Sequence, residues 1–395
     1  MVNNNPDAER VDESSDFDKM SESVGTKSAL TRRTLMKIAG ASGIVAGTGS
    51  MTGAAGADEH ESDEDGEDEE SEELPEILLV GSGGTVANPE TEGYLSPSEL
   101  VEARPELEEV ANISVAGVSQ LGSSQLNKDV LFGIHDAIME AAESSSPPDG
   151  VVVTVGSNTV EEVLYFLNLS LKTELPVVGT AAQRGVDALG TDSDKNLYDA
   201  VRVAGHPDAA GRGALLMVND EIFHARDVTK LVSSRPDGWS SPNTGPVGLT
   251  DGGIEFYQQV ERASYPDTEF DLSNRTPEDF SLGEIDITYS ALGMEGRMVD
   301  AAVEAGTKGF VDAALLTGTS ARPDGKRGLQ SALRHAAQDG IPVVTSHRGT
   351  QGVITGDEDF IGGGSLTPQK ARILLAFGMM EGKEGEELRE LFETY

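Results

Sequence analysis

The chain has 395 residues, no cysteine and a formal net charge of -40. Without cysteine it has no disulfide, no thiolate nucleophile and no cysteine-ligated metal site, and so large an acidic surplus argues against binding nucleic acid through its phosphates. Only twelve of the 69 acidic residues lie in the run 58–73, so the rest of the chain is strongly acidic too. Such a surface favours solubility in concentrated salt, where charges are screened. We therefore expect a halophilic protein, and the scattered histidines give no reason to expect a metal or cofactor.

The first segment resembles a twin-arginine export signal. Arg32 and Arg33 precede an uncharged stretch rich in glycine and alanine, residues 38–57, which ends in a small-residue cleavage pattern. We expect residues 1–57 to direct export, to the outside of the cell or its surface. If the signal is cleaved, we expect no stable membrane contact; an uncleaved anchor is the alternative. The acidic tract 58–74 is then predicted to be a disordered, solvated tail.

From residue 75 onward, short apolar runs alternate with helical patterns, which predicts an α/β fold with a mostly parallel sheet. The predicted strands are 77–80, 151–154, 176–179, 214–218, 310–315 and 342–345. The predicted helices are 126–144, 159–171, 298–305, 329–339 and 368–380. A polar stretch with proline, asparagine and glycine at 265–284 predicts a linker. It separates a larger N-terminal domain, 75–264, from a smaller C-terminal one, 285–395.

Two of the predicted strands end in glycine turns that carry hydroxyl groups. The first leads into Gly-Ser-Gly-Gly-Thr at 81–85, and the second into Gly-Ser-Asn-Thr at 156–159. Ligands gather at the carboxyl ends of parallel strands, and amides on such turns can bind an anion or oxyanion. The first turn lacks the glycine spacing of a dinucleotide-binding loop. A simpler interpretation of the second turn is a capping box between Thr159 and Glu162, which requires no ligand.

These turns resemble the signatures of a known family. The segment ILLVGSGGTVAN is similar to the T-G-G-T-I-A signature of the bacterial-type, type II-like L-asparaginase and glutaminase family, and VVVTVGSNTVEEVLYFL to its H-G-T-D-T-x-E-E-T signature. Matches in PVVGTAAQRG, KNLYDAV, NDEIFHARDVTK and GSLTPQKARILL follow in the family's order. The resemblance implies a two-domain asparaginase-like fold, a homotetramer built as a dimer of dimers, and hydrolysis of a small amide through an acyl-enzyme with release of ammonia.

The resemblance also implies roles for particular residues, carried over position by position. The catalytic residues it implies are Ser82 as nucleophile, Tyr94 as its assistant, Ser157 and Lys230. The substrate-binding residues it implies are Ser123 and Ser124 in LGSSQLN, together with Ser157 and Asn158. On this alignment both signature threonines are replaced by serine, which keeps the hydroxyl and loses a methyl group that restricts χ1.

The change with the largest expected effect is Asn158, where the family has aspartate. An amide carbonyl carries no charge, so recognition of a substrate ammonium weakens, and the loss of an anion near Lys230 lowers the pKa of that amine. Three functions therefore stay open. They are an exported amidohydrolase acting on asparagine or a related amide, a noncatalytic relative that binds a small ligand, and a tRNA amidotransferase subunit. The export signal disfavours the third.

Overall fold

The larger sheet is organised around β1 (Glu76–Gly83), whose residues after Glu76 are all buried. The computed structural model describes residues 73–89 and 93–395, so the predicted export signal and most of the acidic tract lie outside the described residues. The strand order in the sheet is β10-β9-β6-β5-β4-β3-β1-β2, with β1 to β5 parallel and the remaining pairs antiparallel. The other strands are β2 (Asn112–Leu121), β3 (Gly150–Thr154), β4 (Val177–Thr180), β5 (Leu215–Val218), β6 (Glu221–His224), β9 (Gly248–Leu249) and β10 (Glu255–Phe256).

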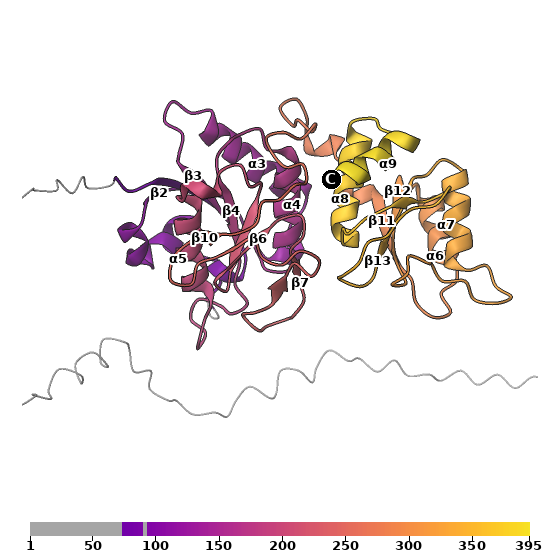
Figure 1. Ribbon diagram of the computed structural model, residues 1–395, viewed down its shortest axis with the longest axis horizontal. Coiled ribbons are helices and arrows are strands. Elements are labelled where there is room, and N and C mark those ends of the chain that lie inside the picture. Colours follow the sequence, from indigo (N-terminus) through magenta and orange to yellow (C-terminus); the bar gives the residue numbers. More distant parts are fainter. Residues whose placement is uncertain (1–72, 90–92) are drawn as a thin grey trace, which may run out of the picture. The chain divides into compact units, whose positions relative to one another are not determined.

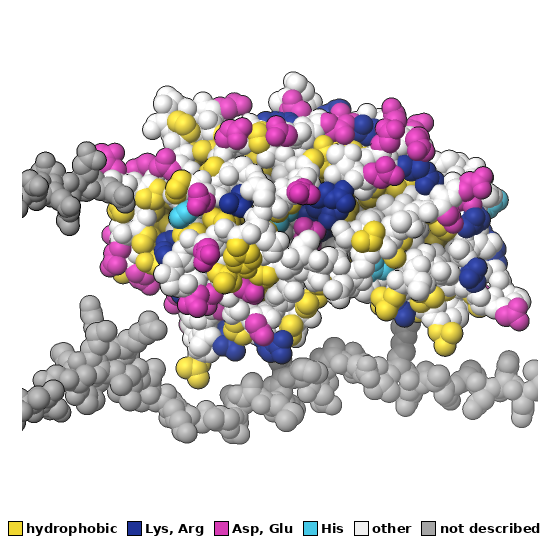
Figure 2. All heavy atoms as spheres, viewed as in Figure 1, with side chains coloured by type: hydrophobic (Ala, Val, Ile, Leu, Met, Phe, Trp, Pro, Cys, Tyr) yellow, Lys and Arg dark blue, Asp and Glu magenta, His cyan; other side chains and the backbone are white. Residues whose placement is uncertain are grey.

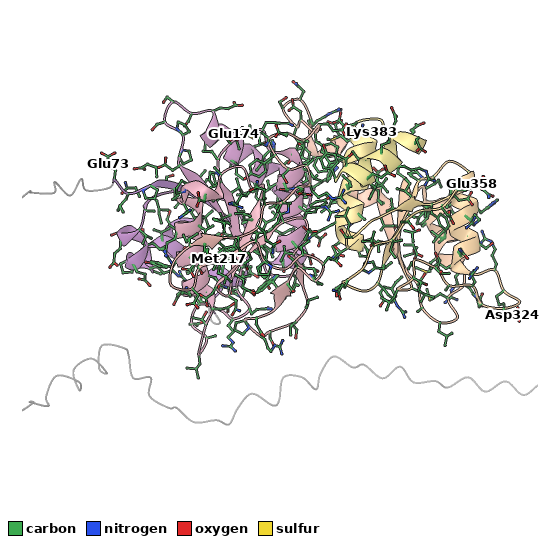
Figure 3. The ribbon with its side chains drawn as sticks, in the orientation of Figure 1. Glu73, Glu174, Met217, Asp324, Glu358 and Lys383 are labelled. Atoms are coloured by element: carbon green, nitrogen blue, oxygen red, sulfur yellow. The ribbon has the colours of Figure 1, made fainter. Side chains whose placement is uncertain are left out.

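Helices cover both faces of this sheet, as a buried parallel sheet requires. Successive side chains of a strand point to opposite faces, and in β1 both sets are apolar: Leu78 and Val80 join one core cluster, while Ile77 and Leu79 join another. The first cluster lies under α3 (Lys128–Ala142) and α4 (Val160–Ser170), and the second under α2 (Pro97–Glu102) and α5 (Ser193–Ala204). Figure 1 shows α3 and α4 on the opposite side of the sheet from α5. Met217 lies on β5 in the larger sheet, and its side chain is fully buried (Figure 3).

A second, smaller sheet is wholly parallel, in the order β11-β12-β13-β14. Its strands are β11 (Ile285–Tyr289), β12 (Gly309–Ala314), β13 (Val343–His347) and β14 (Ile361–Gly362). Helices α6 (Arg297–Ala305) and α7 (Leu329–Gln338) pack on one face, and α8 (Pro368–Met380) packs on the other beside α9 (Gly385–Thr394). The fold is therefore α/β with a larger N-terminal and a smaller C-terminal sheet, as predicted. A separate two-stranded ribbon is formed by β7 (Thr229–Lys230) and β8 (Trp239–Ser240).

The segment 265–284, predicted as a linker, is packed against the rest of the chain. Phe270 and Phe280 are fully buried and contact Phe377 of α8, with ring centroids 4.7 Å and 4.9 Å apart. Phe280 also packs against Phe166 of α4, edge to face at 5.5 Å. One apolar cluster thus runs from α4 through this segment to α8.

Acidic side chains are spread over the whole face shown in Figure 2 rather than gathered in one patch. Within the described residues, no helix is long and apolar enough to cross a bilayer.

Glu162 of α4 is not part of this solvated surface. Burial, reinforced by the neighbouring charge of Glu161, raises the pKa of Glu162 from 4.5 to about 7, while Arg372 and Lys370 oppose the shift. The folded protein thus holds this proton more tightly than the unfolded chain does. Stability that is present at low pH is therefore lost as the pH rises from 4.5 toward 7.

We expect Glu162→Gln to stabilise the protein above pH 7 and to change little near pH 4, because glutamine removes the cost of ionising a buried acid. The shift in pKa corresponds to a gain of at most about 3 kcal/mol in the free energy of unfolding. Urea denaturation of both proteins at several pH values measures it. A difference that does not vary with pH would contradict this account.

Candidate active site

Three of the predicted site residues meet where β3 ends. The Lys230 ammonium donates hydrogen bonds to the hydroxyl of Ser157 at 2.8 Å and to the side-chain carbonyl of Asn158 at 3.0 Å. Ser157 and Asn158 occupy the turn between β3 and α4, whereas Lys230 comes from β7, more than seventy residues later. The structure therefore brings an amine, a hydroxyl and an amide carbonyl to one point.

The surroundings of Lys230 make its amine lose a proton more easily than a free lysine does. Burial lowers the pKa of the Lys230 amine, and the negative charge of Asp192 opposes that shift. Trp239 pairs with Lys230 across the ribbon, and the centroid of its ring lies 5.6 Å from the amine nitrogen. The ring thus covers one side of the amine. An amine that loses its proton more easily than usual can act as a general base toward the adjacent Ser157 hydroxyl.

The predicted capping box is wrong. Thr159 occupies the N-cap position of α4, but its side chain makes no capping hydrogen bond; its backbone, at ψ 6°, is not in the extended conformation typical of an N-cap residue. Its hydroxyl instead donates to the carbonyl of Ser123 at 3.4 Å. Thr159 therefore ties the second glycine turn to the loop around Ser123.

Ser82 does not meet this group. It is fully buried, and its hydroxyl donates to the backbone carbonyl of Thr154 at 2.7 Å, which links β1 to β3 inside the sheet. This placement does not fit the role of attacking group that the family resemblance implied. In the same turn, Thr85 is partly exposed and begins a short 3-10 helix, η1 (Thr85–Ala87). Thr85 was not among the predicted site residues, although it stands in the same glycine turn.

Glycine allows the strand-end turns to touch. Gly83 and Gly84 both have positive φ, 92° and 86°, a backbone conformation that side chains disfavour. A Cβ atom on Gly84 would lie 2.3 Å from the amide nitrogen of Gly156, and one on Gly156 would lie 2.5 Å from the Cβ of Ser123. The segments that carry Thr85, Ser157 and Ser123 are therefore packed directly against one another.

Tyr94 lies at the edge of the same region. A Cβ atom on Gly122 would lie 2.7 Å from the Tyr94 hydroxyl, and the side-chain amide of Gln120 donates to the Tyr94 carbonyl at 3.3 Å. Ser123 and Ser124 belong to a 3-10 helix, η3 (Ser123–Gln125); the first is partly exposed and the second exposed. Tyr94 and Ser123 thus border the turns, while Ser124 faces solvent.

Comparison with known proteins matches two family models to the chain: the asparaginase N-terminal domain over residues 76–262 and the glutaminase/asparaginase C-terminal domain over residues 284–392. The chain belongs to the asparaginase family. It is 35% identical to L-asparaginase 2 of Bacillus subtilis, with 82% of this chain and 87% of that protein covered. It is 31% identical to L-asparaginase 2 of Escherichia coli, with 82% and 94% covered. It is 29% identical to the glutaminase-asparaginase of Pseudomonas fluorescens, with 82% and 91% covered. By family it is an asparaginase-like amidohydrolase.

Sequence reasoning did not single out Asp192, a buried acid whose charge acts on Lys230. Its carboxylate accepts hydrogen bonds from the backbone amides of Gln183 at 2.9 Å and Arg184 at 3.0 Å, and from the side chain of Asn196 at 3.2 Å. These bonds fix the loop that follows β4. Asp192 stands just before the KNLYDAV match, which was the available signal. It is also the charge that opposes the lowered pKa of Lys230.

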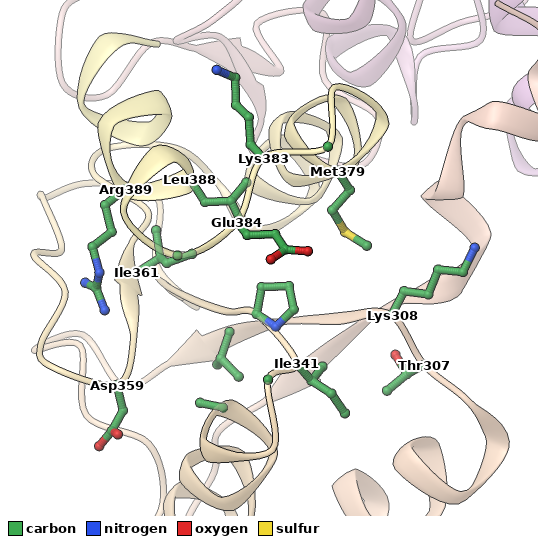
Figure 4. A pocket seen from close by; sticks show the side chains of 16 residues that line it. Thr307, Lys308, Ile341, Asp359, Ile361, Met379, Lys383, Glu384, Leu388 and Arg389 are labelled. Atoms are coloured by element: carbon green, nitrogen blue, oxygen red, sulfur yellow. The ribbon is translucent and has the colours of Figure 1, made fainter.

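A cavity elsewhere in the chain has no part in this site. It measures about 570 Å³ and lies at the amino ends of β12 and β13, among α7, α8 and α9. Figure 4 shows Glu384 pointing into it and Lys383 pointing away. Its lysines are already paired, Lys308 with Glu284 and Lys383 with Glu269, both at 2.7 Å. Among the described residues, no group of three or more metal-binding side chains is placed to hold an ion.

Proposed function

We propose that this protein hydrolyses the side-chain amide of asparagine, or of a closely related small molecule, to the acid and ammonia through an acyl-enzyme. The observation that most directly supports this proposal is the 2.8 Å contact between the Lys230 amine and the Ser157 hydroxyl. An amine whose pKa is lowered by burial can take up a hydroxyl proton and return it to a leaving group. The names of the relatives, L-asparaginase and glutaminase-asparaginase, support this substrate class.

Thr85 is the hydroxyl that we assign to the first attack, in place of Ser82. Thr85 is partly exposed, whereas Ser157 is 6% exposed and Ser82 is fully buried. The Thr85 oxygen attacks the amide carbon, and the carbon–nitrogen bond breaks as ammonia leaves. The proton lost by Thr85 reaches the departing nitrogen through Ser157 and Lys230. Water then cleaves the resulting ester, which restores Thr85 and releases the acid.

The test of this function is ammonia release by the mature protein in multimolar salt, with asparagine, glutamine and N-acylated asparagine as separate substrates. Saturable hydrolysis of at least one of them supports the proposal. Saturable binding without any ammonia would instead favour the noncatalytic, ligand-binding alternative.

Selectivity is expected to depend on Asn158, whose carbonyl oxygen is held by Lys230 at 3.0 Å. Asn158→Asp adds a charge that can accept hydrogen bonds from a substrate ammonium, so we expect kcat/KM for free asparagine to rise about 10-fold relative to N-acylated asparagine. The same carboxylate raises the pKa of Lys230, which moves the rising limb of the pH profile to higher pH. Kinetics with both substrates across pH measure the two effects. Unchanged selectivity would contradict this role for Asn158.

Export and assembly are further parts of the proposal. The arginine pair at 32 and 33 supports export by the twin-arginine route to the outside of the cell or its surface, and N-terminal sequencing of protein recovered from the medium tests it. The family resemblance supports a homo-oligomer, a dimer of dimers, and sedimentation in high salt tests that assembly. The acidic composition supports a halophilic protein.

A further inference from the structure

A buried ion pair lies directly behind the proposed catalytic lysine. Lys370 of α8 is 1% exposed and Glu161 of α4 is 5% exposed, and the lysine nitrogen is 3.6 Å from a carboxylate oxygen of the glutamate. Removing two charges from water is costly, and an apolar pair of similar volume would often hold two helices together as well or better. Joining two helices therefore does not explain why charged residues stand here. Their role follows from the other hydrogen bonds that the two side chains make.

Both charges bind the same short segment of chain, residues 226–230. The Lys370 ammonium donates to the backbone carbonyls of Arg226, at 3.1 Å, and Val228. The other oxygen of the Glu161 carboxylate accepts from the Thr229 hydroxyl at 3.2 Å and from the backbone amide of Lys230 at 3.4 Å. Lys370 thus holds the backbone carbonyls of the segment that ends at Lys230, and Glu161 holds its hydroxyl and amide donors.

Glu161 also belongs to the helix that presents the partners of Lys230. It lies in the first turn of α4, four residues after Ser157 and three after Asn158. The start of α4 therefore makes two contacts with Lys230. Glu161 binds its backbone amide, and Ser157, just before the helix, binds its side-chain amine. We propose that Glu161 and Lys370 are positioning residues that fix the distance between the Lys230 amine and the Ser157 hydroxyl, so that the C-terminal domain takes part in the site through α8.

This proposal rests on the proposed function only where it concerns turnover, because the position of Lys230 has a separate readout. Trp239 is the only tryptophan of the chain, and its ring lies 5.6 Å from the Lys230 amine. Its fluorescence therefore reports on the charge and placement of that amine. The negative charge of Asp192 acts on Lys230, whereas the Ser157 and Asn158 side chains that contact its amine are neutral.

The main test is the double variant Glu161→Gln with Lys370→Met, which removes both charges and leaves no unpaired ion inside the protein. We expect a folded protein with a melting temperature near that of the wild type. We expect kcat to fall at least about 10-fold with little change in KM, because displacement of a catalytic group by about 1 Å is enough for such a loss. We also expect an altered pH titration of Trp239 fluorescence.

Two further variants complete the design. Thr229→Val removes only the hydroxyl that binds Glu161; it should lower kcat about threefold, and it keeps the proposal testable if the double variant does not fold. Lys383→Met breaks the ion pair with Glu269, and Lys383 borders the separate cavity rather than the site; it should leave kcat and the fluorescence titration unchanged.

The outcomes separate the two proposals. A folded double variant with wild-type kcat and a wild-type fluorescence titration overturns the positioning role. If the double variant does not fold, a Thr229→Val protein with wild-type kcat and a wild-type fluorescence titration overturns the positioning role. If the wild type itself releases no ammonia from any amide, the proposed function fails, while the fluorescence titrations still decide whether the pair places Lys230.

Discussion

Thr85→Val abolishes amide turnover, whereas Ser82→Ala leaves kcat/KM within about threefold of wild type. This is the expected result if the partly exposed hydroxyl of the first glycine turn attacks the substrate. The Ser82 hydroxyl is engaged with the Thr154 carbonyl inside the sheet, and its removal should affect stability by about 1 kcal/mol without touching the chemistry. Valine keeps the shape of Thr85 and removes its oxygen, so a loss of at least about 10³-fold in kcat is expected.

Steady-state kinetics in high salt, with thermal melting of each variant, measure these effects. Rapid acid quenching followed by mass spectrometry of peptides should find the acyl group on Thr85. Ser170→Ala is a matched control, because Ser170 is also fully buried and also donates to a backbone carbonyl, that of Phe166 at 2.9 Å, at the far end of α4. An inactive Ser82→Ala protein that melts normally, or an acyl group on Ser157, would refute the assignment of Thr85.

The central strands were predictable because parallel strands buried on both faces are continuous apolar runs. The predicted strands at 77–80 and 151–154 correspond to β1 and β3, which are buried almost throughout. The edge strand β2 was missed because its residues are mostly exposed or half-buried and mix polar with apolar side chains. The amphipathic helix α5 was also missed, since KNLYDAV within it was used only as a family match.

The site was predictable in its location and only partly in its residues. The rule that ligands gather at the carboxyl ends of strands led to Ser157 and Asn158, and the family resemblance led to Lys230. Ser82 was predicted as the attacking group without regard to burial: it lies within β1, whose two faces are both covered, so a side chain of either parity is buried there. Thr85 lies beyond the end of β1 and is partly exposed.

Contacts among side chains from distant segments were not predictable in the same way. The Lys370–Glu161 pair joins residues more than two hundred positions apart, and no sequence pattern marks either as buried. Glu162, read as a capping residue, is instead an acid whose pKa is raised to about 7. Such features depend on how helices pack, which periodicity does not specify.

Lys230→Met should abolish ammonia release at every pH, and Lys230→Arg should be nearly as inactive. Methionine removes the amine that contacts Ser157. Arginine keeps a positive charge but does not give up its proton in proteins, so it cannot serve as a base. The expected loss for both is at least about 10³-fold in kcat.

In the wild type, turnover should rise with pH as Lys230 loses its proton, and that rise should lie below the usual range of lysine because burial lowers the pKa of this amine. The profile of kcat/KM against pH measures it, and Lys308→Met, which breaks the contacts of Lys308 with Glu284 and Ser281, is the matched control. An active Lys230→Arg protein would show that Lys230 contributes charge rather than proton transfer. Catalysis would then depend on electrostatic stabilisation of the developing oxyanion, and the Ser157–Lys230 contact would no longer explain how the leaving nitrogen obtains its proton.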